Sequence, residues 1–111
     1  MKSTTQQAFS PAQSKAAELF KALSHPARLA ILDLLSQQKN CLCGNITEEL
    51  PLAQSTVSQH LKVLKSAGLI KGEIDGVRVC YCLDADGLQA LRQLALPFIE
   101  ELNTNYLNNC C

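Results

Sequence analysis

The segment 54-QSTVSQHLKVL-64 combines an apolar stripe with a polar face. Val57, Leu61 and Leu64 recur at helical spacing and predict a helix that is buried along one side. A glycine follows shortly after the segment, at a position typical of the residue just past a helix end, so we expect the helix over Gln54–Ala67. Its opposite face carries short hydroxyls, amides and lysines.

Two runs with a period of two follow this helix. Leu69–Ile74 and Val77–Leu83 flank Asp75-Gly76, and an Asp-Gly pair between such runs is a strong signal for a β-hairpin. Because side chains alternate along a strand, Cys80 and Cys82 should share one face of the hairpin. We interpret these two cysteines as surface or interface residues.

Helices are also predicted on both sides of this unit. Ser10-Pro11 opens the first helix, because a capping residue followed by proline is typical of a helix start. A second, more apolar helix follows His25-Pro26, and a short helix ends before Pro51. A last helix starts near Asp86, and its apolar residues are spaced three and four apart, as in helix pairing: Leu88, Leu91, Ala95, Phe98 and Leu102.

The expected order is helix, helix, short helix, helix, hairpin, helix. A short helix, a tight turn and a helix rich in small polar residues form a helix-turn-helix, and the hairpin behind it is the wing. A chain of 111 residues, 47% hydrophobic and 18% charged, has room for one globular core. We therefore predict a single, mainly α winged-helix domain over residues 1–111, with flexible tails at 1–10 and 104–111.

Charge is distributed unevenly although the formal net charge is zero. Residues 1–83 carry nine Lys or Arg against six Asp or Glu, and such segregation lets one face meet a polyanion. On the 54–67 helix, hydroxyls and amides suit base edges in the major groove, while lysines suit phosphates; an ordinary solvated face is the alternative. The predicted DNA-binding residues are Gln54, Ser55, Thr56, Ser58, Gln59, His60, Lys62, Lys65 and, on the wing, Arg78.

Six cysteines form three close pairs: Cys41 with Cys43, Cys80 with Cys82, and Cys110 with Cys111. The sequence shows no stretch like a secretion signal and no apolar run of membrane-spanning length, so we expect a cytoplasmic protein. Thiols stay reduced in the cytoplasm. Clustered cysteines there are more often ligands of soft ions or redox sensors than structural disulfides.

Four motifs together resemble the ArsR/SmtB family of metal-responsive repressors. They are LSHPAR at 23–28, QSTVSQHLKVL at 54–64, AGL at 67–69 and GVRVCY at 76–81. The similarity covers about residues 14–94. It implies a winged-helix homodimer that pairs through its first and last helices and binds an inverted repeat in a double-stranded DNA operator. It also implies that an inducer weakens the DNA complex.

The first cysteine pair falls where the arsenic-sensing branch of that family carries Cys-Val-Cys-Asp-Leu-Cys. The resemblance implies that Cys41 and Cys43 bind As(III) or Sb(III) as thiolates, with other soft thiophilic ions as alternatives. Ile46 stands where the third cysteine of the pattern is expected. Cys110 and Cys111 are therefore candidates for a third ligand, from the same or the partner subunit. Two small buried loop residues are the alternative interpretation of the first pair.

Other functions remain as alternatives at this point. A repressor that senses thiol oxidation or persulfides would also use several cysteines, and a winged helix could bind a protein instead of DNA. An enzyme is disfavoured, because the sequence has no Cys-x-x-Cys, no glycine-rich phosphate loop and no nucleophile with an evident His or carboxylate partner.

Overall fold

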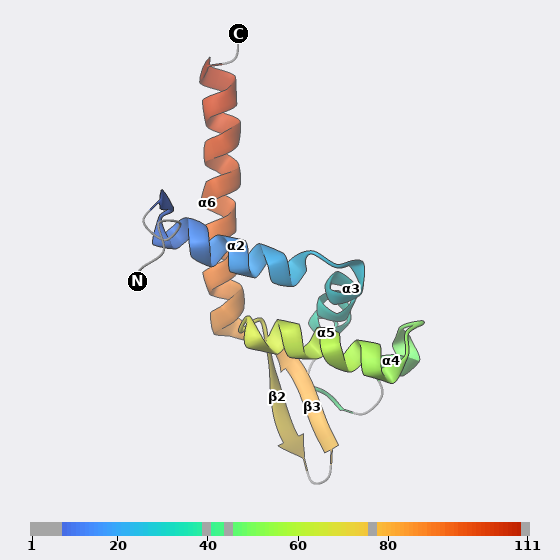
Figure 1. Cartoon of the computed structure of the whole chain (residues 1–111). Helices are drawn as coiled ribbons and strands as arrows, with labels where there is room; N and C mark the ends of the chain where they lie inside the picture. Colours follow the sequence, from blue (N-terminus) through green and yellow to red (C-terminus); the bar gives the residue numbers. More distant parts are fainter. Residues whose placement is uncertain (1–7, 39–40, 44–45, 76–77, 110–111) are drawn as a thin grey trace.

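The structure, a computed structural model, describes residues 8–38, 41–43, 46–75 and 78–109. Figure 1 shows the elements in chain order, and they are α2 (Pro11–Leu23), α3 (Pro26–Ser36), β1 (Leu42–Cys43), α4 (Ile46–Glu49), α5 (Gln54–Ser66), β2 (Ile70–Asp75), β3 (Arg78–Leu83) and α6 (Ala85–Asn109). The predicted fold class, a mainly α winged helix, is confirmed. The sequence did not predict the strand β1.

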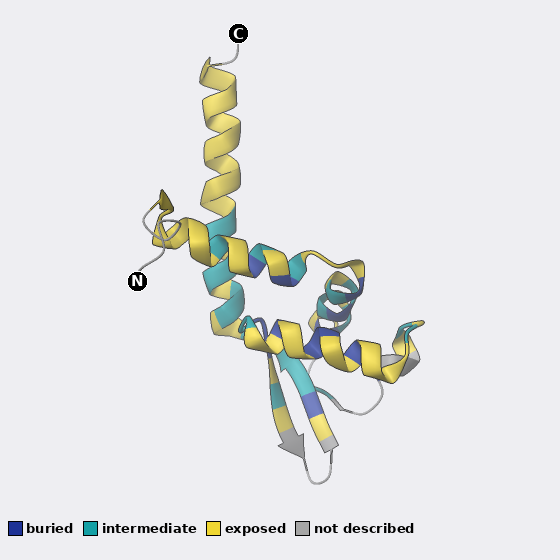
Figure 2. Ribbon diagram, in the orientation of Figure 1, coloured by how far each residue is buried: buried dark blue, intermediate teal, exposed yellow. Residues whose placement is uncertain are grey.

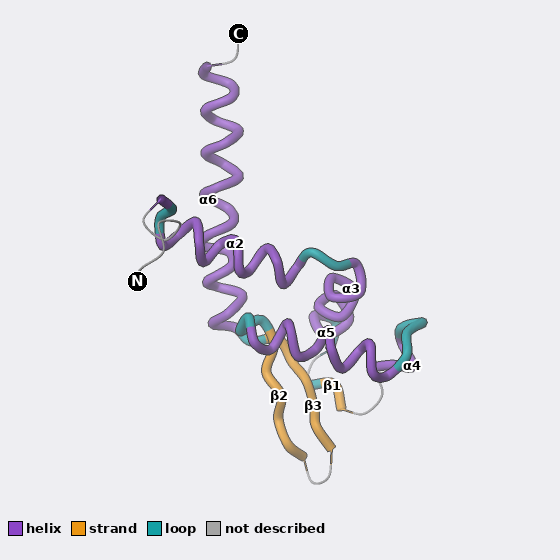
Figure 3. Tube along the Cα trace, in the orientation of Figure 1, coloured by secondary structure: helices purple, strands orange, loops and turns teal. Residues whose placement is uncertain are grey.

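The sheet is antiparallel and has the strand order β1-β3-β2, so β3 lies in the middle (Figure 3). Tyr81 of β3 pairs with Leu42 on one side and with Gly72 on the other. The wing is therefore extended by a segment that precedes the helix-turn-helix. A two-residue strand is too short to show a period in the sequence, which explains why the sequence did not indicate a strand there.

The core lies where α2, α3, α5 and the sheet meet, and Figure 2 shows their inner sides as buried. Val57, Leu61 and Leu64 of α5 are all buried, as their spacing predicted. Large side chains with less than 2% exposure come from four elements and the turn after α5: Leu19, Ile31, Leu64, Leu69 and Ile70. Gly68 adopts a φ of 80°, the conformation that the position after a helix end requires.

Side chains cap the starts of two long helices. At α2, Gln13 N donates to Ser10 Oγ and Ser10 N donates to Gln13 Oε1, each over 3.0 Å, which completes a capping box. At α6, Asp84 Oδ1 accepts from the backbone N–H of Asp86 at 3.0 Å and of Gly87 at 3.4 Å. These bonds fix where α2 and α6 begin, because they satisfy N–H groups that lack a partner within the helix.

The helix α6 continues to Asn109, where we expected a tail from residue 104. No glycine or proline follows Pro97 in the sequence to end the helix, and Asn109 Nδ2 donates to Asn105 O at 3.1 Å. The half of α6 beyond α2 is exposed and points away from the hairpin (Figures 1 and 2). Among the described residues, none of the helices has both the length and the apolarity that a membrane span requires.

Candidate DNA-reading helix and cysteine site

The polar face of α5 is open to solvent. Eight residues of α5 are predicted to contact DNA, and all of them except His60 are exposed: Gln54, Ser55, Thr56, Ser58, Gln59, Lys62 and Lys65. The opposite face packs on α3 and β2, and the helix lies along the edge of the molecule (Figure 1). A helix that is supported on one side and polar on the other has the geometry of a recognition helix in the major groove.

His60 does not lie on that face. Its side chain is 9% exposed, and its ring centroid is 4.3 Å from that of His25. The expectation that His60 contacts DNA is therefore corrected by its burial. The signal was present in the sequence, because His60 follows Val57 by three residues and precedes Leu64 by four, which places it within the apolar stripe.

Arg28 joins this buried histidine to the end of α2. Its Nε donates to Ala22 O at 2.7 Å, its Nη2 donates to Lys21 O at 3.2 Å, and its Nη1 lies 3.1 Å from His60 Nδ1. The last carbonyls of a helix lack partners within the helix, and a cation there is favourable. Because a guanidinium only donates, His60 must accept at Nδ1 and is neutral. Arg28 thereby fixes α5 relative to α2.

Burial lowers the pKa of His60 below 6.5, and the nearby charges of His25 and Arg28 act in the same direction. The unfolded chain therefore takes up this proton at a higher pH than the folded protein. We expect the contribution of His60 to the free energy of unfolding to be complete above about pH 6.5 and to decrease as the pH falls through the folded-state pKa. Urea unfolding at about pH 7.5 and pH 5.5 measures it.

The matched variant for this measurement is His60→Gln, which keeps an acceptor for Arg28 but does not titrate. Its free energy of unfolding should decrease less than that of the unaltered protein over the same pH interval. An equal decrease in both proteins would show that His60 does not contribute to the pH dependence.

Two further cations lie at or beside the wing. Arg78 is the first residue of β3 and pairs with Asp75, the last residue of β2, at the end of the hairpin where residues 76–77 connect the two strands; its side chain lies outside what the structure describes. Lys65 is exposed, and its ammonium lies against β2, so that a Cβ atom at Gly72 would be 3.4 Å from Lys65 Nζ. Lys65 thus reaches from the DNA-reading helix to the wing.

The disulfide joins cysteines from two different pairs of the sequence, which we did not expect. Cys41 forms a disulfide with Cys82, with Cα atoms 4.4 Å apart. This separation is that of two opposite residues in a non-hydrogen-bonded pair of an antiparallel sheet. Two residues along the same ladder, Cys43 pairs with Cys80. The partner of Cys41 is therefore on β3, and it is not Cys43.

The interpretation of Cys80 and Cys82 as surface or interface residues is also corrected. Cys80 is 3% exposed and is disulfide-bonded, and Cys82 bonds Cys41. The sequence signal that would have revealed this is the repetition of Cys-x-Cys. With one residue between them, the two cysteines of each segment share a face of a strand, so pairing of the two segments gathers four cysteine positions on one face.

A carboxylate lies beside the disulfide. The Sγ atoms of Cys41 and Cys82 and a carboxylate oxygen of Glu73 all lie within 4.8 Å of one another. Cys82 Sγ is 4.0 Å from Glu73 Oε1, and Lys71 Nζ is 3.8 Å from the same oxygen. The side chain of Cys43, and Cys110 and Cys111 altogether, lie outside the described residues, so their predicted roles as metal ligands stay predictions.

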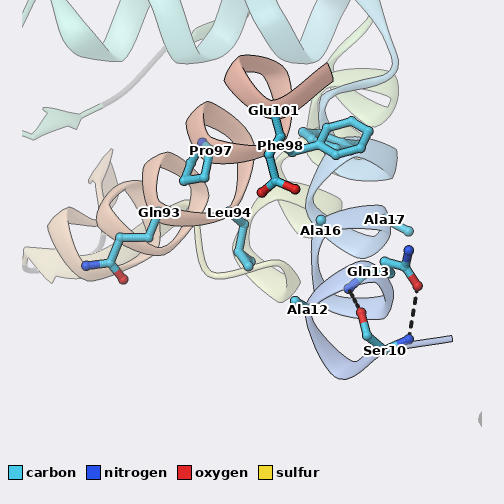
Figure 4. Close-up of a pocket in the computed structure, with 11 residues that line it drawn as sticks. Ser10, Ala12, Gln13, Ala16, Ala17, Gln93, Leu94, Pro97, Phe98 and Glu101 are labelled. Carbon is cyan, nitrogen blue, oxygen red and sulfur yellow. Dashed lines mark hydrogen bonds between the residues drawn. The ribbon is translucent and has the colours of Figure 1, made fainter. Parts of the chain in front are cut away.

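The crossing of α2 and α6 forms an apolar groove of about 660 Å³ (Figure 4). Ala16 and Ala17 line it from α2 and Leu94 and Pro97 from α6. The ring centroids of Phe20 and Phe98 lie 6.2 Å apart. Large apolar side chains on α6 are between 46% and 68% exposed, namely Leu96, Phe98, Ile99, Leu102, Tyr106 and Leu107. An exposed apolar surface of this kind is typical of an interaction site.

Comparison with known proteins identifies the fold family. Residues 25–71 match the family described as "Bacterial regulatory protein, arsR family". An uncharacterized HTH-type transcriptional regulator of Methanocaldococcus jannaschii is 41% identical over 81 residues, which cover 72% of this chain and 90% of that protein. The chain belongs to the ArsR/SmtB family of transcriptional regulators.

Further similarities agree with the assignment of this regulator to the family. The HTH-type transcriptional repressor SmtB of Mycobacterium tuberculosis is 43% identical over 68 residues, which cover 61% of the regulator and 50% of SmtB. The structure of HlyU from Vibrio cholerae N16961 aligns with a TM-score of 0.64 and 27% identity, over 93% of the regulator and 100% of HlyU. Members of the family bind operator DNA, are generally dimeric, sense metal ions and are not enzymes.

Proposed function

We propose that this regulator is a repressor whose operator complex is released when As(III) or Sb(III) binds cysteine thiolates at β1 and β3. The observation that carries the proposal is the position of Cys41 directly across from Cys82, with Cα atoms 4.4 Å apart. Two sulfurs held that close, once reduced, suit a soft thiophilic ion. The resemblance to the arsenic-sensing branch supports this class of inducer.

The third ligand has two sources. Cys43 lies on the same face of the sheet as Cys41 by its register, and the C-terminal pair Cys110-Cys111 is the other source. Within one subunit, α6, which ends at Asn109, runs away from β1 (Figure 3). The arrangement of the elements therefore favours a third thiolate from the strands over one from the C-terminus of the same subunit.

The position of this site suggests how inducer binding reaches the DNA. The strand β1 leads into α4, which packs against α5, while β3 is part of the wing. An ion that joins β1 to β3 would set the orientation of the helix-turn-helix relative to the wing. Both parts contact the duplex in a winged helix, so a change in their relative orientation would weaken the complex.

Operator binding itself is proposed to use two copies of the chain. An inverted repeat matches a two-fold symmetric dimer, with one recognition helix for each half-site. The exposed apolar side chains of α6 and the groove beside α2 (Figure 4) support pairing through the first and last helices. The polar face of α5 would read bases, and Lys62, Lys65 and Arg78 would contact phosphates.

The test measures operator affinity of the reduced protein with and without arsenite. We expect arsenite to weaken binding by about tenfold or more in the unaltered protein and in the control variant C110S/C111S. Cys41→Ser and Cys82→Ser should bind the operator but no longer respond, and Cys43→Ser shows whether the third thiolate comes from β1. Release by arsenite that persists in both Cys41→Ser and Cys82→Ser would overturn the assignment of this site.

Thiol oxidation is a second candidate signal, and the Cys41–Cys82 disulfide favours it. Two thiols would lose two protons and two electrons to a hydroperoxide, which is reduced to an alcohol and water, and one sulfur–sulfur bond would form. Comparison of oxidised and reduced protein in the same assay, without arsenite, separates the two signals. Equal affinities would remove this candidate, and failure of both forms to bind any operator would favour a protein partner.

A further inference from the structure

We propose that Cys41, Glu73 and Cys82 form, in the reduced protein, a mixed thiolate–carboxylate site for a divalent ion of the Zn²⁺ and Cd²⁺ class. This site extends over the whole sheet, because Glu73 lies on β2, Cys82 on β3, and Cys41 directly precedes β1. The proposal goes beyond release by As(III) or Sb(III) and does not depend on it, since it concerns a different ion class and includes an oxygen ligand.

The three ligand atoms already lie close to a coordination geometry. They are within 4.8 Å of one another, and Cys82 Sγ is 4.0 Å from Glu73 Oε1. In a tetrahedral zinc site, bonds of about 2.3 Å to sulfur and about 2.1 Å to oxygen place neighbouring ligands about 3.5–3.8 Å apart. Small side-chain rotations bring the carboxylate to that separation, and the two sulfurs reach it when their bond is reduced.

The chemistry of the three ligands selects the ion. Zinc and cadmium accept thiolate together with carboxylate, whereas As(III) would need a third thiolate at the place of Glu73. Two thiolates and a carboxylate carry three negative charges against two on the ion, and Lys71, 3.8 Å from Glu73 Oε1, offsets the remainder. The side chain of Glu73 is 55% exposed, so an ion has access and the fourth position is open to water.

Ion binding and the disulfide exclude each other, because they use the same two sulfur atoms. A dithiol or phosphine reductant supplies two electrons, the sulfur–sulfur bond breaks, and two thiols result. The ion then displaces the thiol protons as it binds. The protein therefore takes up the ion only after reduction, and the oxidised state with the disulfide is an ion-free state.

The test titrates Cd²⁺ alone into full-length protein that was reduced with a phosphine and kept anaerobic, without DNA. We expect one ion per subunit and sulfur-to-cadmium charge-transfer absorption of two thiolates. Cys41→Ser and Cys82→Ser should lower the affinity by more than about 100-fold, and Glu73→Gln by about tenfold, as judged by competition with a chromophoric chelator. The control C110S/C111S should keep the charge-transfer intensity, and protein that retains its disulfide should bind no ion there.

Two results would overturn the proposal. One is unchanged affinity in Glu73→Gln and Cys82→Ser, both checked by circular dichroism to be folded. The other is an absorption of three or four thiolates that is lost in Cys80→Ser, which would replace the carboxylate with further cysteines. Because the assay contains no operator, its outcome is independent of whether arsenite releases DNA.

Discussion

Gly87→Ala is expected to lower the free energy of unfolding by about 2–4 kcal/mol, because it overpacks a contact between two backbones. A Cβ atom on Gly87 would overlap the carbonyl oxygen of Gly68, and it would lie 2.6 Å from the carbonyl carbon of Gly68 and 3.3 Å from Leu69 Cα. Backbone atoms cannot rotate away as a side chain can. The first turn of α6 would have to move off the turn that follows α5.

Urea unfolding measures this effect, and Gly68→Ala provides a matched control. Gly68 has a φ of 80° but open space around its Cβ position, so that variant should lose only about 1–2 kcal/mol, the cost of the left-handed conformation. Alanine in a helix interior is otherwise about 1 kcal/mol more favourable than glycine. A Gly87→Ala protein as stable as the unaltered one, or more stable, would mean that α6 does not pack this closely on the turn.

Arg28→Ala is expected to cost about 2–4 kcal/mol of unfolding free energy, because it removes the donor to the helix-end carbonyl of Ala22 and to the buried His60, while Lys21 O keeps Ser24 as a donor. Operator affinity should decrease as well, since Arg28 is what holds α5 against the end of α2. Urea unfolding and operator titration measure the two effects in the same protein.

Two further variants show whether the geometry or the charge of the Arg28 guanidinium is responsible for the loss of stability. Arg28→Lys keeps the charge but not the planar fork that reaches three acceptors, so most of the loss should remain. Lys21→Ala removes an exposed cation of the same helix end whose own side chain donates none of these bonds, and it should change stability by less than about 0.5 kcal/mol. Equal stability of Arg28→Ala and Lys21→Ala would contradict the role given to the guanidinium.

Local signals in the sequence predicted most of the fold. The spacing of Val57, Leu61 and Leu64 predicted the buried side of α5, and Ser10-Pro11 predicted the start of α2. Asp75-Gly76 predicted the hairpin, although β2 includes Asp75 and the first paired residue of β3 is Arg78. Each of these features depends on residues a few positions apart, which is why the sequence alone was sufficient.

The candidate site was predictable only in part, because its contacts connect distant parts of the chain. The polar face of α5 is exposed, as its sequence predicted, except for His60. We assigned His60 to the DNA-contacting residues because it is polar, although its spacing places it in the apolar stripe. The role of Cys41 as a ligand residue stays a prediction. Its partner Cys82 is 41 residues away in the sequence, and this pairing depends on β1, which is too short to be recognised before the sheet is known.

The disulfide between residues 41 and 82 divides the chain into a closed ring and two arms. The ring holds β1, α4, α5, β2 and nearly all of β3, which together include the helix-turn-helix and the wing, while α2 and α3 form one arm and α6 the other. A conformational change within the ring can therefore reach the arms in two ways. One is through the covalent chain at residues 41 and 82, and the other is through side chains that pack between the ring and an arm. Arg28 is such a side chain, and its contact with His60 lies on the buried side of α5, opposite the exposed polar face of that helix.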